Sequence, residues 1–179
     1  RVTMELSGHA PFIVFEDANI EKVTDIAMAS KYRNNGQVCI SPSRFYIHES
    51  KKEEFTKSFV EKTKKLKIGN GLEEGVQLGP LTTKKRLEEV EQLVEETKKE
   101  GAKVLCGGQR PAGFNKGYFY EPTIFDNVKD NFKIMTVEPF GPLSPITTFK
   151  SFDEVIKRAN NHSAGLAGYV CTNSMDLAN

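Results

Sequence analysis

The sequence predicts an α/β sandwich built around a largely parallel β-sheet. Strand-like apolar runs and segments of helical periodicity alternate across nearly the whole chain, as expected for parallel strands joined by helices. No internal repeat, low-complexity stretch or linker divides the sequence. With 179 residues the chain can bury a sizeable core without disulfides or metal. We therefore expect one compact domain.

The first elements are a strand and a helix. The continuous apolar run 11–15 suits a strand buried on both faces, and segment 16–19 that follows it holds two possible N-cap residues. The helix is expected over residues 20–33, because Asn34-Asn35-Gly36 tolerates the left-handed backbone that ends helices. One stripe of this helix contains Ile20, Val23, Ile26, Ala27 and Ser30.

Two further helices are expected in the middle of the chain. Residues 44–48 form a strand, and the next helix presents one apolar face and closes at 69–71. A third amphipathic helix ends at Gly101 and precedes a strand at 103–106. The apolar faces are Phe55, Phe59, Thr63 and Leu66 in the second helix, and Leu87, Val90, Val94 and Thr97 in the third.

The last third is less regular. Residues 107–142 are rich in Gly, Pro and Asn and are expected to form loops with an irregular hairpin. Regular elements then return as a strand at 143–149, a helix at 152–160 and a strand at 166–171. Residues 174–179 have the composition of a helix start.

Composition disfavours several classes of partner. The chain holds 25 Lys and Arg against 24 Asp and Glu, so its net charge of +1 gives no field that would attract nucleic acid or an anionic membrane. No run approaches 18 apolar residues. Three widely spaced cysteines fit a reducing compartment, which indicates the cytoplasm or an organelle matrix.

No residue pattern predicts a metal site or a phosphate-binding loop. The three histidines are far apart, and no C-x-x-C or H-E-x-x-H is present. Segment 69–75 is rich in glycine, but it follows a helix and its last glycine is one residue late for a dinucleotide-binding turn. We interpret it as a helix stop and loop.

Cys39 and Glu5 are the candidate chemical groups. Cys39 follows a helix end in a polar loop where a thiol can be reached, whereas Cys106 and Cys171 lie in apolar strand contexts typical of inert cysteines. Context alone leaves a nucleophilic and a structural role for Cys39 equally open. Glu5 has apolar neighbours at a strand end, where desolvation would suit a general base, but an ordinary carboxylate facing water is the alternative.

Three ordered motifs resemble those of the aldehyde dehydrogenase family. Segment 4–15 (MELSGHAPFIVF) resembles the E-L-G-G-K-x-P signature, and 35–39 (NGQVC) resembles the cysteine motif at the expected separation. Segment 138–142 (EPFGP) is similar to E-x-F-G-P. Further landmarks at 79–81 and 120–123 extend the resemblance over essentially all of the chain.

The resemblance implies a fold, a reaction and site residues. The fold is a three-layer α/β sandwich, and the reaction is NAD- or NADP-dependent oxidation of an aldehyde to an acid through a cysteine thioester. Cys39 corresponds to the nucleophile and Glu5 to the general base, while Glu138 and Phe140 correspond to contacts with the nicotinamide ribose and ring. Arg33 corresponds to the arginine that binds a distal carboxylate in the succinate-semialdehyde branch. A surface arginine favoured by the helix dipole is the alternative for Arg33.

The resemblance also implies what else the whole protein contains. Residues 1–179 correspond to the catalytic domain, so a dinucleotide-binding domain and a C-terminal oligomerisation arm are expected outside this chain, giving a homo-oligomer. Ser7, His9 and Ser41 depart from the family pattern. The first two keep open an alternative, in which the protein is a catalytically silent structural or binding module.

Overall fold

The computed structural model describes residues 1–178, which contain one six-stranded mixed sheet. All neighbouring strands pair in parallel except β3 and β4, which are antiparallel. The predicted largely parallel sheet is therefore confirmed. In spatial order the strands are β3 (Lys103–Cys106), β4 (Thr123–Asp126), β5 (Leu143–Phe149), β2 (Pro42–His48), β1 (Ala10–Val14) and β6 (Tyr169–Cys171).

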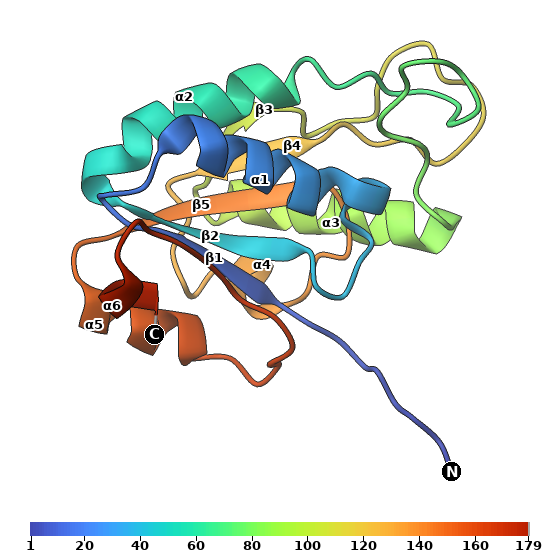
Figure 1. Ribbon diagram of the computed structural model, residues 1–179. Coiled ribbons are helices and arrows are strands. Elements are labelled where there is room, and N and C mark those ends of the chain that lie inside the picture. The colour runs from blue at the N-terminus through green and yellow to red at the C-terminus, as the bar shows by residue number, and fades with distance from the viewer. Residues whose placement is uncertain (179) are drawn as a thin grey trace.

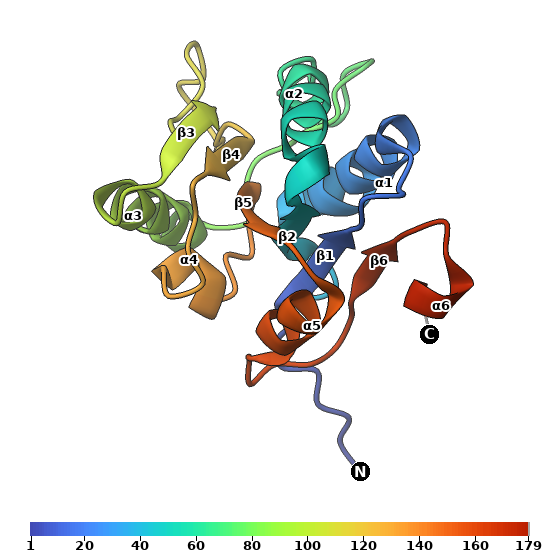
Figure 2. The same ribbon diagram turned by 90° about the vertical axis from the view of Figure 1, so that its left-hand side faces the viewer.

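Helices cover both faces of the sheet and form the expected three layers (Figures 1 and 2). Helices α1 (Ile20–Tyr32) and α2 (Lys52–Thr63) lie on one face. The other face is covered by α3 (Lys84–Lys99), α4 (Lys133–Thr136) and α5 (Phe152–Asn160). The short helices η1 (Arg33–Gly36), η2 (Glu49–Lys51) and α6 (Met175–Ala178) complete the described elements.

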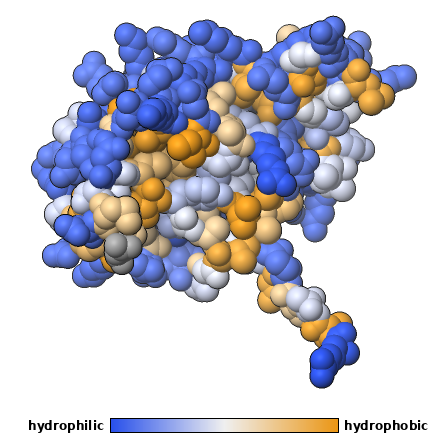
Figure 3. Space-filling view, viewed as in Figure 1, coloured by the Kyte–Doolittle hydropathy of each residue, from blue (hydrophilic) through white to orange (hydrophobic). Residues whose placement is uncertain are grey.

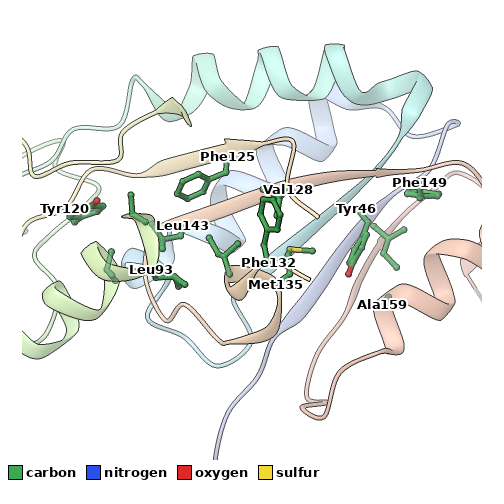
Figure 4. Packing of buried hydrophobic residues seen from close by; sticks show 14 of the residues in the cluster. Tyr46, Leu93, Tyr120, Phe125, Val128, Phe132, Met135, Leu143, Phe149 and Ala159 are labelled. Atoms are coloured by element: carbon green, nitrogen blue, oxygen red, sulfur yellow. The ribbon is translucent and has the colours of Figure 1, made fainter. Parts of the chain in front are cut away.

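Each face of the sheet carries its own hydrophobic cluster. Successive residues of β2 divide between them: Phe45 packs toward α1 and α2, and Tyr46 packs toward the opposite helices. Figure 4 shows this second cluster, with Phe125, Leu143 and Met135 gathered between the sheet and the helices. Burial on both faces is what a central parallel strand requires, and it explains the continuous apolar runs of the sequence.

Helix α1 begins and ends as predicted, but its buried stripe differs. The Asn19 side chain caps its start by accepting from the backbone N–H of Lys22 at 3.1 Å. The stripe was predicted to pass through Ile26 and Ser30, yet Ile26 is 50% exposed. The buried residues are instead Ile20, Val23, Thr24, Ala27, Lys31 and Tyr32. Helical periodicity is equally consistent with the predicted and the observed buried face of α1. Only the packing of α1 in the folded protein could therefore decide which of its residues are buried.

The other differences concern element ends and one strand. Helix α2 ends at Thr63, although Leu66 still packs against the cluster under α1 and α2 from the following loop. Strand β4 lies inside segment 107–142, where the sequence predicts only loops and a hairpin. It has four residues and is fixed by pairing with β3 and β5, which local sequence does not reveal. Strand β6 begins at Tyr169, three residues later than predicted.

Residues before β1 form an extended arm that leaves the body of the molecule (Figure 1). Its side chains alternate between apolar and polar, and Val2, Met4 and Leu6 are 88%, 70% and 80% exposed (Figure 3). The pattern is that of a strand, but the arm has no pairing partner among residues 1–178. Within the same described range, no helix has both the length and the hydropathy needed to cross a bilayer.

Candidate functional site

The three motif segments lie at one edge of the sheet. Strands β5, β2 and β1 are neighbours and run parallel, so their amino ends share an edge. Cys39 lies three residues before β2, and Gly8 lies two residues before β1. Glu138 lies five residues before β5. Topology therefore brings together segments that are far apart in sequence.

Close backbone contacts join these segments. A Cβ added to Gly8 would overlap the carbonyl oxygen of Cys39, and one added to Gly36 would overlap the carbonyl oxygen of Gly141. The backbone N–H of Gly8 also donates to Glu138 Oε1 at 3.4 Å. Glycine is required at positions 8 and 36 because backbone passes against backbone there.

The loop that carries Cys39 is held in a defined shape. Asn34, Asn35 and Gly36 have φ values of 48°, 60° and 71°, which confirms the left-handed helix end expected from the sequence. Contacts from segment 79–82 support the loop: the Asn35 amide donates to the Gly79 carbonyl, and the Gln37 side chain accepts from the Thr82 N–H at 2.9 Å. These contacts hold the backbone that leads to Cys39 against segment 79–82.

The three cysteines are all free and half-buried, but their surroundings differ. Burial raises the pKa of Cys106, which lies on β3. Burial also raises the pKa of Cys171, on β6, to about 11. Both strand cysteines are thereby held as thiols at neutral pH. Cys39 lies in a polar loop outside the sheet.

Glu5 does not have the expected environment. The sequence predicts a carboxylate partly desolvated at a strand end, whereas Glu5 is exposed on the extended arm, ahead of the first strand residue Ala10. The prediction of desolvation is wrong for this chain, because a single extended segment has no neighbour to cover its side chains. Glu5 nevertheless contributes to the charge that raises the pKa of Glu138.

Glu138 and Phe140 occupy the turn before β5. Burial raises the pKa of Glu138, the hydrogen bond from Gly8 and the charges of Arg86 and Lys31 lower it, and the charge of Glu5 raises it. Phe140 has a φ of 38°, a rare conformation for an aromatic residue that is often found at functional sites. The Arg86 guanidinium stacks over its ring at 5.3 Å.

Arg33 follows the last residue of α1 and is exposed. It lines a cavity of about 330 Å³ together with Val38 and Ile40, the two neighbours of Cys39. Tyr169 closes one side, with its hydroxyl donating to the Ile40 carbonyl at 2.8 Å. The cavity thus places one cation among mostly apolar side chains beside the cysteine loop.

Two buried titratable residues near this edge were missed as candidates. His9 is 2% exposed, and its Nδ1 lies 2.7 Å from the Ser43 hydroxyl; burial lowers its pKa to about 3, and the charges of Arg44 and His162 act in the same direction. Lys31 is completely buried. The sequence signal that could have predicted the burial of Lys31 is its position one helical turn after Ala27, on the same face of α1. Residues 1–178 contain no His, Cys, Asp and Glu cluster able to hold a metal ion.

The Cys39 loop, the Gly8 segment and the Glu138 turn therefore meet at the amino ends of parallel strands in an α/β protein. The chain belongs to the aldehyde dehydrogenase family, whose model matches residues 1–179.

Individual relatives agree with this assignment. The chain is 46% identical over 178 residues to aldehyde dehydrogenase 1A1 of Mesocricetus auratus, covering 99% of this chain and 35% of that protein. Among solved structures, succinate-semialdehyde dehydrogenase from Burkholderia pseudomallei matches with a TM-score of 0.95 at 39% identity, covering 98% of this chain and 36% of the other. The NAD⁺ complex of aldehyde dehydrogenase from Bacillus cereus matches with a TM-score of 0.94 at 40% identity, covering 98% and 35%. The chain therefore spans about a third of the length of these relatives.

Proposed function

We propose that this chain supplies the nucleophile and the general base of an NAD(P)-dependent aldehyde dehydrogenase that forms carboxylic acids. The main support is the contact of three segments, in which the Gly8 backbone touches Cys39 and donates to Glu138. The activity is that of the whole protein, of which the chain carries the cysteine-bearing part.

Cys39 is the proposed nucleophile. Its thiolate adds to the carbonyl carbon of the aldehyde, and the carbonyl oxygen becomes an oxyanion. The backbone N–H of Cys39 donates to no acceptor within residues 1–178, so it can donate to that oxygen.

Glu138 and Phe140 fit the nicotinamide end of the cofactor. Glu138 is half-buried and, within residues 1–178, accepts a single weak hydrogen bond of 3.4 Å, so a carboxylate there has acceptor capacity for ribose hydroxyls. Phe140 presents an aromatic ring from a strained backbone position. When bound, NAD(P)⁺ accepts the hydride that turns the cysteine adduct into a thioester.

Glu5 is the proposed base for hydrolysis of the thioester. Glu5 lies three positions before Gly8, whose backbone touches Cys39, and its charge acts on Glu138 of the same group of segments. By taking a proton from a water molecule, Glu5 would allow hydroxide-like attack on the thioester carbonyl. The carboxylic acid then leaves and Cys39 is regenerated.

The test is to trap the thioester. In the whole protein, Glu5→Gln should give one stoichiometric burst of reduced cofactor and then slow turnover, because acylation remains and water activation is lost. Mass spectrometry should find the acyl group on the peptide that contains Cys39. Glu16→Gln, which changes another exposed carboxylate beyond β1, is the matched control. Unchanged steady-state turnover in Glu5→Gln would exclude Glu5 as the base, and an unmodified Cys39 would favour a silent structural or binding module.

The substrate we propose is an aldehyde with a distal carboxylate, such as succinate semialdehyde. Arg33 supports this choice, because its guanidinium lines the cavity next to both neighbours of Cys39 and forms no ion pair with the acidic side chains of residues 1–178. A guanidinium can hold a carboxylate through two parallel hydrogen bonds. The apolar lining suits the carbon chain between the two ends of the substrate.

A further inference from the structure

Arg44 is a buried cation that the proposed reaction does not use. It lies in strand β2 and is only 3% exposed. No carboxylate within residues 1–178 forms an ion pair with its guanidinium. Burying a charge that has no anionic partner is costly, so Arg44 needs an explanation beyond packing.

A second arginine on the same side of the sheet has the counter-charges that Arg44 lacks. Arg158, on α5, pairs with Asp130 at 2.6 Å and with Glu154 at 2.7 Å. Both guanidinium groups also contact the ring of Tyr46, at 5.2 Å for Arg158 and 5.9 Å for Arg44. The fold therefore supplies two carboxylates to one of these arginines and none to the other.

Part of the Arg44 guanidinium is held in place and part of it is free to bind. Its Nε donates to the His9 carbonyl at 2.8 Å, and its Nη2 donates to the Ala159 carbonyl at 3.0 Å. These two bonds fix the plane of the group between β1 and the end of α5. Its Nη1 donates to no acceptor within residues 1–178, so these N–H groups remain for an oxygen from outside.

Arg44 lines a cavity of about 450 Å³. The rest of the lining comes from residues 9 and 11, from the end of α5 and from loop 162–168, and it contains no Asp or Glu. Within the loop, the backbone N–H groups of Gly165, Leu166 and Ala167 donate to no acceptor among the described residues. The cavity thus combines a fixed positive charge with unused N–H donors, and no carboxylate competes for them.

The two histidines of the cavity add no negative charge. Their rings, His9 and His162, meet edge to face at 4.8 Å. Burial lowers the pKa of His9 to about 3, and the charges of Arg44 and His162 act in the same direction. An anion is therefore the group that these surroundings would stabilise.

We propose that this cavity is a binding site for an oxyanion, a carboxylate or phosphate group whose oxygens accept from the Arg44 guanidinium and the N–H groups of loop 162–168. A guanidinium fits such a group because it can offer two parallel N–H donors. The site is separate from the cavity beside Cys39, since the two cavities share no lining residue. The proposal therefore does not depend on the proposed function.

The test follows the backbone NMR signals of Gly165 and Ala167 while sodium phosphate or sodium acetate is added to this chain. Sodium chloride is exchanged for each salt, so that the ionic strength stays constant and only the oxyanion changes. Both signals should shift along a saturable curve with phosphate and with acetate. Shifts that stay linear with concentration would overturn the proposal.

Substitutions at arginines locate the site. Arg44→Met should bind both anions at least about tenfold more weakly, as expected for the loss of hydrogen bonds from a charged group. Arg44→Lys should lie between this variant and the wild type, because it keeps the charge and loses the fork. Arg110→Met is the matched control, since Arg110 is exposed and pairs with Glu91 at 2.7 Å. Equal affinity of Arg44→Met and the wild type, or a loss caused by Arg33→Ala instead, would overturn the proposal.

A further variant covers the case in which Arg44→Met does not fold, since Arg44 holds two carbonyls. Ala164→Phe leaves Arg44 unchanged and places a larger side chain in the lining of the cavity. It should also weaken binding at least about tenfold, because the oxyanion and the ring cannot occupy the same space. Unchanged affinity in this variant would contradict binding in the cavity.

The same titration in the whole protein identifies the source of the oxyanion. Saturable shifts there assign the site to a free anion. Saturable shifts in this chain but none in the whole protein assign it to an acidic side chain from the rest of the protein, which supplies the same chemistry. In that case Arg44→Met should lower the free energy of unfolding in urea more in the whole protein than in this chain.

Discussion

At the scale of single residues, the environment of each cysteine decides what chemistry it can do. All three thiols are half-buried, so exposure alone does not distinguish them. Cys106 and Cys171 lie in strands whose apolar surroundings disfavour the thiolate. Cys39 lies in a polar loop whose shape is set by a left-handed turn and by contacts from segment 79–82.

Alkylation should follow this difference. At pH 7, iodoacetamide should modify Cys39 well before Cys106 and Cys171, because the raised pKa values of the two strand thiols leave almost no thiolate to react. Peptide mass spectrometry of time points measures the three rates. In urea the rates should converge, which is the control for intrinsic reactivity. Equal rates in the folded protein would contradict the assignment of Cys39.

Arg33 can be tested by a substrate comparison. In the whole protein, Arg33→Ala should lower kcat/KM for succinate semialdehyde by about 1.5 to 3 kcal/mol, the scale of a hydrogen bond to a charged group, and change little for an apolar aldehyde. Lys22→Ala, at an exposed cation near the other end of α1, is the control. If both substrates lose equally, Arg33 serves the helix end and not the substrate.

At the scale of elements, the site is built where strands begin. In open α/β sheets ligands commonly bind beyond the carboxyl ends of the strands, and sequence reasoning would look for a site there. Here the cysteine loop, the Gly8 segment and the Glu138 turn all precede their strands. The connection between α1 and β2 therefore contains a tight turn. In this turn the backbone of Gly36 packs directly against the backbone of Gly141.

Replacing Gly36 should show how strongly this turn is constrained. Gly36→Ala should lower the free energy of unfolding by more than about 2 kcal/mol, because its φ is 71° and the added methyl group would overlap the backbone of Gly141. Urea unfolding of the chain measures the effect. Gly71→Ala is the matched control, since Gly71 lacks a positive φ and has open space around it, and it should change stability by less than about 0.5 kcal/mol. Similar values for the two variants would mean that the turn relaxes freely.

At the scale of the whole molecule, stability depends on keeping buried titratable groups in their neutral form. His9 is enclosed at the start of β1 by Ser43, Arg44 and His162, and none of these is an acidic residue that could stabilise an imidazolium. The Arg44 side chain donates to the His9 carbonyl at 2.8 Å, so a guanidinium lies close to the His9 ring. A protonated His9 would place a second positive charge beside it. Protonation of His9 therefore opposes folding.

The free energy of unfolding should accordingly fall in acid. The folded pKa of His9 is about 3 against an ordinary value of 6.5, so the unfolded chain binds the extra proton as the pH drops below 6.5. His9 should remove up to about 1.4 kcal/mol per pH unit between pH 6.5 and 3. In His9→Asn this part of the slope should disappear, as measured by urea unfolding at a series of pH values. Parallel curves for the two proteins would show that His9 is not buried as a neutral group.

Much of the architecture could be predicted from local sequence. The span of α1, the end of α3 just before Gly101, and the bounds of β5 and α5 followed from periodicity, caps and glycine, because these signals act within a few residues. Strand β4 and the centre of the α1 stripe did not follow, since both depend on which distant surface packs against them.

The sequence by itself determined the fold class, the left-handed turn and the three motifs, including the residue types at positions 5, 33, 39, 138 and 140. Only the tertiary structure decided that the motif segments touch, that Glu5 is exposed and that Lys31 is buried beside the Glu138 turn. The physical reason is that backbone conformation and amphipathicity are local properties. Desolvation and charge coupling depend instead on neighbours that are brought together from opposite ends of the chain.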